Sequence, residues 1–271
     1  MRIYSIAVFL FLYVPIGIIV LFSFNSGRHA ADFQGFSVQW YGKALSNPFV
    51  MEALTTSLII ALSAAVLSSL MGTTAALALQ RMRGPVRVMF DGLIYISIMI
   101  PGIVIGIATL VALVTVFDFL NPVLAAFWPG DAKPPKMTLG YATVIAAHTL
   151  FTMSLVIVLV RARIAGMDRT LIEASEDLYA TPWRTFYQIT LPQIYPAILA
   201  GFLLSFTFSF DDFIISFFVA GANTTLPIYV FASIRRGITP EVNAIGTLVL
   251  GVSLTLLIGA QYALRARLNN R

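Results

Sequence analysis

Long apolar runs alternate with short polar segments along the chain. Six of the runs reach about 20 residues, the length at which an α-helix crosses the hydrocarbon core of a bilayer. They predict six membrane-spanning helices, at residues 4–24, 54–79, 88–117, 139–160, 194–220 and 242–264. We therefore expect an all-α membrane protein in which residues 1–271 form a single transmembrane domain.

Three of these runs carry further signals. The first, Tyr4–Phe24, is longer than the apolar part of a signal peptide and no A-x-A cleavage site follows it, so we expect a retained span. The second is rich in Ala, Ser, Gly and Thr, which let helix backbones approach closely and predict a position inside the bundle. The third contains Pro101-Gly102 and Gly106, which predict a kink or break.

The segments between the spans contain prolines and polar turn residues. Asn121-Pro122 and Pro134-Pro135 lie between the third and fourth spans, and Pro227 lies between the fifth and sixth. Because proline ends or bends a regular helix, we expect loops or short interfacial helices in these segments.

Charge is scarce, and its placement predicts the orientation. Of the residues, 59% are hydrophobic and 11% are charged, against about 25% charged in an ordinary soluble domain. Eleven of the seventeen Lys and Arg residues fall on the side that holds both termini, which predicts cytoplasmic N- and C-termini. Orientation in membrane lipid thus explains the net charge of +5, and no nucleic-acid partner is expected. With no cysteine and two histidines, the sequence indicates no metal site.

A polar segment at residues 168–192 separates the fourth and fifth spans. Asp168 begins a short helix with several acidic residues, and Thr181-Pro182 supplies the N-cap and first residue of a second helix. We expect a turn at residues 179–181 between these helices, and Leu191-Pro192 to end the second one. Composition alone is equally consistent with an amphipathic connector lying on the lipid head groups.

Glu173-Ala174-Ser175 is followed after three residues by Tyr179, and after nine more by Ile189-Thr190-Leu191-Pro192. This spacing resembles the E-A-A-x3-G-x9-I-x-L-P loop of ABC-importer permeases. Ser175 replaces the second alanine, and Tyr179 replaces the glycine. Since glycine is the residue best suited to a left-handed turn, we expect a tighter or differently shaped turn at Tyr179.

The resemblance implies a coupling loop that contacts an ATP-binding partner subunit. Glu173 is placed to complement a helix N-terminus or a basic group of that partner. The implied coupling residues are Glu173, Ala174, Ser175, Asp177, Leu178, Tyr179, Ala180, Thr181 and Pro182.

The resemblance also implies a complex in the bacterial inner membrane. Its other members are a second permease, two ATP-binding subunits and an extracytoplasmic substrate-binding protein. This chain has no G-x-x-x-x-G-K-[ST] phosphate loop, so we expect it to be no enzyme and to hold no cofactor. ATP and Mg²⁺ are assigned to the partner ATPase.

Further motifs along the chain are Phe24-Asn25-Ser26, Trp40-Tyr41, the run Leu204–Phe213, Leu226-Pro227 and Pro240-Glu241-Val242-Asn243-Ala244. They resemble the permeases of the spermidine/putrescine importer group, and the second permease most closely. This resemblance implies import of a small cationic solute such as a polyamine, while permeases for opines, amino-acid derivatives or phosphonates stay open as alternatives.

Two adjacent acids, Asp211 and Asp212, lie within the predicted fifth span. A carboxylate there is costly unless it faces a cavity or a partner. We expect one of the two to face the path of a polyammonium ion, with Phe208, Phe210 and Phe213 adding cation–π contacts. The alternative is that the pair caps a helix or packs against the partner permease without touching substrate.

Two other classes of membrane protein have sequence features that this chain does not show. A stand-alone secondary transporter usually has inverted repeats with interrupted helices at matching positions. A membrane-embedded enzyme needs convergent His, Asp, Ser or metal-binding residues near one interface. His148, in the fourth predicted span, is expected to be a hydrogen-bonded polar residue at a helix contact rather than a proton relay.

Overall fold

The computed structural model describes residues 2–28, 32–129, 133–237 and 239–269. Regular structure in these residues is helical, apart from an isolated bridge between Asn25 and Phe36, which confirms the all-α class. His29, one of the two histidines, and Arg271, one of the eleven basic residues on the side of the termini, lie outside the described residues. The helices form two compact units, one of residues 54–228 and one of residues 1–53 and 229–271.

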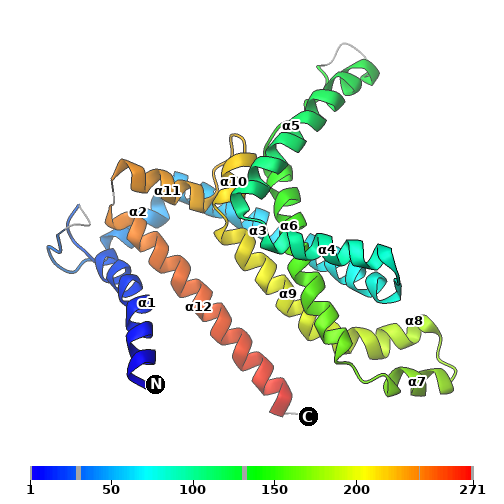
Figure 1. The fold of residues 1–271 in the computed structure, drawn as a ribbon. Helices are drawn as coiled ribbons and strands as arrows, with labels where there is room; N and C mark the ends of the chain where they lie inside the picture. The colour runs from blue at the N-terminus through cyan, green and yellow to red at the C-terminus, as the bar shows by residue number, and fades with distance from the viewer. Residues whose placement is uncertain (1, 29–31, 130–132, 238, 270–271) are drawn as a thin grey trace. The chain divides into compact units, whose positions relative to one another are not determined.

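The unit of residues 54–228 contains most of the long helices, and α6 and α9 pack along each other within it (Figure 1). Its elements are α3 (Pro48–Arg81, which begins in the other unit), α4 (Pro85–Met99), α5 (Gly102–Phe127), α6 (Tyr141–Ala165), α7 (Thr170–Asp177), α8 (Pro182–Thr185), a π-helix (Phe186–Thr190), α9 (Leu191–Asp211), α10 (Ile214–Val219) and the start of α11 (Leu226–Arg236).

The second unit joins the two ends of the chain. Helix α12 (Pro240–Asn269) packs against α1 (Arg2–Ser23) and against the short α2 (Gln39–Ser46). Asn47 donates hydrogen bonds from Nδ2 to Glu241 Oε1 at 2.9 Å and to the Tyr229 hydroxyl at 3.3 Å. Glu241 lies in the first turn of α12, where a negative charge favours the helix N-terminus.

Five helical segments in the described residues are long and apolar enough to cross a membrane. Helix α12 covers the predicted sixth span, but several of its side chains lie outside the described part. The five are Tyr4–Ser23, Pro48–Arg81, Gly102–Phe127, Tyr141–Ala165 and Pro182–Asp211.

The predicted third span is divided between two helices. Ile100 and Pro101 are extended, so α4 ends and α5 begins at the proline, as the sequence predicted. The predicted loop or short interfacial helix at Asn121-Pro122 is instead the continuation of α5, which runs past the predicted end of the span at residue 117 to Phe127. Pro122 removes only one hydrogen bond of the helix. The side chain of Asn121 accepts a hydrogen bond from the Met137 backbone N–H at 2.8 Å and donates one to the Met137 carbonyl oxygen at 3.2 Å.

The small-residue helix α3 lies inside its unit, as predicted. Ala61, Ala64 and Ala65 are fully buried. Ser68 Oγ lies 2.6 Å from Thr152 Oγ1 on α6, a contact that needs close helix backbones. Small side chains thus let α3 and α6 pack with polar groups between them.

Candidate functional site

The cytoplasmic loop predicted from the sequence folds as two short helices with a sharp turn. Helix α7 ends in a Schellman motif, in which Tyr179 N–H bonds Glu176 O at 2.9 Å and Ala180 N–H bonds Ser175 O at 3.0 Å. Tyr179 has φ of 56°, the left-handed conformation that glycine adopts most easily. Tyrosine thus adopts a left-handed conformation at the position where the loop pattern has glycine, and the expected difference in turn shape stays a prediction.

A buried hydrogen bond holds the two helices of the loop together. Ser175 Oγ on α7 lies 2.6 Å from Thr185 Oγ1 on α8, and both side chains are buried. Ser175 therefore faces the inside of the loop and not its outer surface. A serine at this position supplies a cross-link that alanine would not.

The other predicted coupling residues lie mostly on the surface. Glu173 and Asp177 are exposed on α7, and Leu178 and Tyr179 are 82% and 96% exposed at the turn. Thr181 is the N-cap of α8 and Pro182 its first residue, as predicted, although Thr181 makes no side-chain cap bond. Leu178, Tyr179 and the 72% exposed Trp183 give the tip of the loop an apolar surface flanked by acids.

Asp168 anchors the start of α7. Its Oδ1 accepts hydrogen bonds from the Thr170 hydroxyl at 2.8 Å and from the Thr170 backbone N–H at 2.9 Å. These two bonds, the hydroxyl first, lower the pKa of the Asp168 carboxyl below its ordinary value of 3.8. The loop thus enters its first helix with a charged residue fixed at the helix start.

The second loop helix runs without a break into the membrane helix. Leu191-Pro192 does not end it, contrary to the prediction, and Pro182–Asp211 is one continuous helical segment of 30 residues. The π-helical turn explains this, because Leu191 N–H bonds Phe186 O, five residues back, just before the proline. The second loop helix and Asp211 therefore belong to one helical segment, which contains the π-helical turn, Pro192 and Pro196.

The predicted single fifth span is in fact two helices. Helix α9 ends at Asp211, Asp212 is extended, and α10 starts at Ile214. The physical reason is that Asp212 Oδ2 accepts the backbone N–H of Ser216 at 2.9 Å. Its side chain thus caps α10 and competes with continuation of α9.

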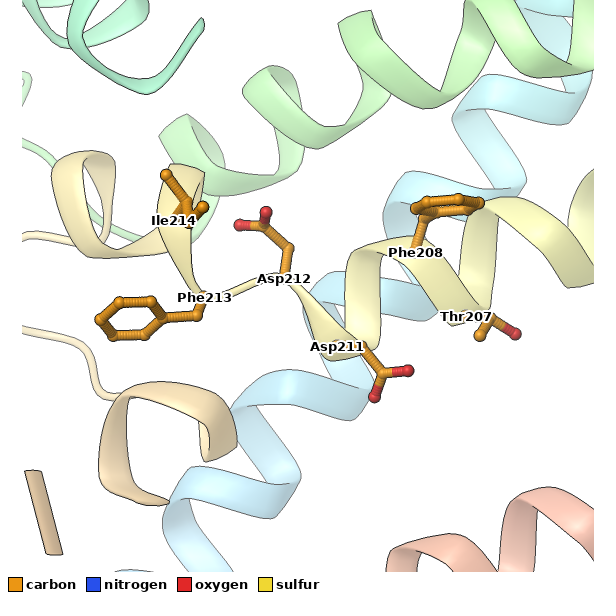
Figure 2. Close-up of a pocket in the computed structure, with 6 residues that line it drawn as sticks. All are labelled: Thr207, Phe208, Asp211, Asp212, Phe213 and Ile214. Carbon is orange, nitrogen blue, oxygen red and sulfur yellow. The ribbon is translucent and has the colours of Figure 1, made fainter. Parts of the chain in front are cut away.

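A cavity of about 550 Å³ lies at this break (Figure 2). Its volume falls in the range of ~300–1,000 Å³ common for small-molecule sites. Figure 2 shows the two carboxylates pointing to different sides of the chain, Asp211 on the side of Thr207 and Asp212 on the other. The lining residues are Thr207, Phe208, Asp211, Asp212, Phe213 and Ile214.

The two acids differ in their surroundings. Asp212 is paired, because besides Ser216 its Oδ2 lies 3.2 Å from Nε2 of the buried His148. Asp211 is exposed, and none of the described residues makes a hydrogen bond or ion pair with it. The end of α9 adds partial negative charge from backbone carbonyls that have no partner within the helix. The cavity therefore offers a cation one uncompensated carboxylate at a negative helix end.

The structure brings together three of the four residues predicted for the substrate path. Asp211, Asp212 and Phe213 line the cavity. Phe210 is not among the lining residues and instead stacks on Phe206, with ring centroids 5.9 Å apart. His148 was predicted to be a hydrogen-bonded residue at a helix contact and is one, but its link to Asp212 joins residues 64 positions apart, which spacing alone does not reveal.

Comparisons with known proteins agree with this architecture. Residues 64–270 match the family described as binding-protein-dependent transport system inner membrane component. The chain is 39% identical to the putrescine transport system permease protein PotI of Escherichia coli K12 over 247 residues, covering 90% of this chain and 83% of PotI. It is 34% identical to the spermidine/putrescine transport system permease protein PotC of the same strain over 260 residues, covering 96% and 91%.

Solved structures share the fold. A chain of a bacterial ABC transporter involved in the import of the acidic polysaccharide alginate superposes with a TM-score of 0.75 at 16% identity, over 98% of this chain and 93% of that one. A chain of an amino acid ABC transporter gives a TM-score of 0.56 at 18% identity, over 85% and 99%. With the family match over most of its length and relatives aligned nearly end to end, the chain belongs to the inner-membrane components of binding-protein-dependent ABC importers, as a multi-pass permease of the group that holds PotI and PotC.

Proposed function

We propose that this permease forms part of the path by which a polyamine, such as putrescine or spermidine, enters the cell. The observation that carries the proposal is the unpaired Asp211 carboxylate in the cavity at the end of α9. Phe208 and Phe213 line the same cavity, and their faces attract ammonium groups. The two relatives aligned above are named for putrescine and spermidine transport, which supports the same substrate class.

The driving force comes from partner subunits. The acidic and apolar tip of the loop, with Glu173 and Tyr179, docks on an ATP-binding subunit that holds ATP and Mg²⁺. Two such subunits, a second permease and an extracytoplasmic binding protein complete the importer. The chain itself crosses the membrane six times, with α12 as the sixth crossing and both termini in the cytoplasm.

The experiment measures polyamine uptake by the complete complex reconstituted in proteoliposomes. Replacing both acids, Asp211→Asn with Asp212→Asn, is expected to lower uptake of putrescine or spermidine by about tenfold or more, since one lost charge contact of ~1.4 kcal/mol already corresponds to tenfold. Both residues keep their size, so assembly of the complex should persist.

The matched control is Asp118→Asn, which neutralises an exposed carboxylate on α5 that is not among the cavity-lining residues. It should leave uptake unchanged. Uptake at the unmodified rate in the double variant, with the complex assembled, would remove the two acids from the substrate path. Uptake of a neutral or anionic solute in place of polyamines would overturn the substrate class.

A further inference from the structure

One buried imidazole spans the break between α9 and α10. His148 on α6 is 2% exposed. Its Nδ1 lies 2.7 Å from Ser209 Oγ, which precedes the break, and its Nε2 lies 3.2 Å from Ser216 Oγ, which follows it. The same Nε2 lies 3.2 Å from Asp212 Oδ2 in the break itself. A single ring on a third helix thus contacts all three parts of the interruption.

The chemistry of the carboxylate fixes the direction of the bond between His148 and Asp212. A carboxylate oxygen can only accept, so Nε2 carries the proton that is donated to Asp212. Nδ1 faces the Ser209 hydroxyl at 2.7 Å, and a hydroxyl can donate to a ring nitrogen or accept from it. Asp212 Oδ2 therefore accepts from both His148 and the Ser216 amide. This leaves Asp212 fixed and Asp211 without a partner among the described residues.

A second cavity supports a role beyond simple packing. It has a volume of about 240 Å³, and His148, Ser209 and Asp212 are among its lining residues. Asp212 and Phe208 line both this cavity and the larger one that holds Asp211. Asp212, whose carboxylate His148 contacts, therefore borders both cavities.

We propose that His148 is a positioning residue for transport: it holds Asp212 in the break so that Asp211 alone meets the cation. This inference rests on the proposed function, because it assigns the two acids of the proposed path to different tasks. Asp212, Ser209 and Ser216 form the support, and Asp211 forms the contact. His148 acts through Asp212 and does not touch the substrate.

A double-mutant cycle in the reconstituted complex tests this. His148→Ala and Asp212→Asn should each lower polyamine uptake, by about tenfold, and the double variant should be no slower than Asp212→Asn alone, since both remove one interaction. His148→Gln keeps a donor near Nε2 and should retain uptake within about threefold. Losses that multiply in the double variant, or equal losses in His148→Ala and His148→Gln, would overturn the positioning role.

Controls separate this inference from the proposed function and from misfolding. Thr149→Val removes a neighbouring buried hydroxyl that has no hydrogen-bond partner in the described structure, and it should leave uptake unchanged. If His148→Ala does not assemble, the cycle is run with His148→Phe, which removes both ring nitrogens and fills a similar volume, and non-additivity with Asp212→Asn remains the required result. Asp211→Asn alone should lower uptake. If it does not, the proposed path fails, while the cycle still decides whether His148 acts through Asp212.

Discussion

Tyr179 adopts a left-handed backbone conformation at the position where the loop pattern of the permeases has glycine. Its left-handed conformation costs most residues about 1–2 kcal/mol. The Schellman bonds around it and the Ser175–Thr185 hydrogen bond hold the turn in this conformation. The exposed ring then adds apolar surface at the point where the loop meets its proposed partner.

Glu173 carries the residue-scale prediction. It is an exposed acid on α7, so Glu173→Ala should not disturb the fold of the loop. The variant should lower the ATPase activity that the binding protein stimulates by about tenfold, because a loss of that size corresponds to the free energy of one hydrogen bond to a charged group. The reconstituted complex gives both ATPase and uptake rates. Glu176→Ala, another exposed acid of the same helix that was not assigned to the contact, is the matched control. Unchanged stimulation in the Glu173 variant would rule out its coupling role.

At the residue scale, sequence preferences that act within a few positions predicted helix starts, whereas contacts between residues on different helices could not be predicted. Thr181-Pro182 marked the start of α8 because N-cap and first-turn preferences act within a few residues. The capping of α10 by Asp212 and its link to His148 could not be read from spacing, since the partner lies on another helix. The assignment of separate tasks to Asp211 and Asp212 therefore needed the structure.

At the scale of helices, close packing is concentrated around Val156 on α6. Gly72 on α3 and Gly201 on α9 both approach this fully buried side chain. A Cβ atom on Gly72 would lie 2.8 Å from Val156 Cβ and 3.1 Å from the Met153 carbonyl oxygen. A β-branched neighbour and a helix backbone have little room to move, so the three helices depend on these two glycines.

Gly72→Ala should therefore destabilise the permease by about 1–3 kcal/mol through overpacking. Thermal unfolding of the purified complex in detergent measures the effect. Gly92→Ala on α4 is the matched control, because a Cβ there meets nothing within 4 Å and alanine is the better helix former. An unfolding temperature of Gly72→Ala equal to that of the unmodified protein would show that α3 and α6 can separate without cost.

The helices themselves were easier to predict than their interruptions. Runs of apolar residues gave the positions of α1, α3, α6 and α12, and Pro101 gave the break before α5. The continuation through Pro122 and Pro192 and the break at Asp212 were not predicted, because each depends on a compensating bond. Those bonds are Asn121 to Met137, Leu191 to Phe186, and Asp212 to Ser216.

At the scale of the whole molecule, the proposed topology can be tested directly because the chain contains no cysteine. Single cysteines at Lys43 and Lys136 should react with a membrane-impermeant maleimide in intact spheroplasts. Cysteines at Arg83, Glu176 and Arg267 should react only after permeabilisation. Labelling at position 267 from outside would contradict the sixth crossing, and labelling at position 176 would contradict the cytoplasmic loop.

The uninterrupted helical segment Pro182–Asp211 joins the Thr181-Pro182 turn of the loop to the Asp211 carboxylate through one continuous backbone. Thirty residues at ~1.5 Å per residue correspond to a helical path of about 45 Å. The π-helical turn, Pro192 and Pro196 lie in the loop half of this path, and they are the features at which a helix bends. Because no loop interrupts the segment, the Thr181-Pro182 turn and the Asp211 charge can change their relative position only if the helix bends at these features.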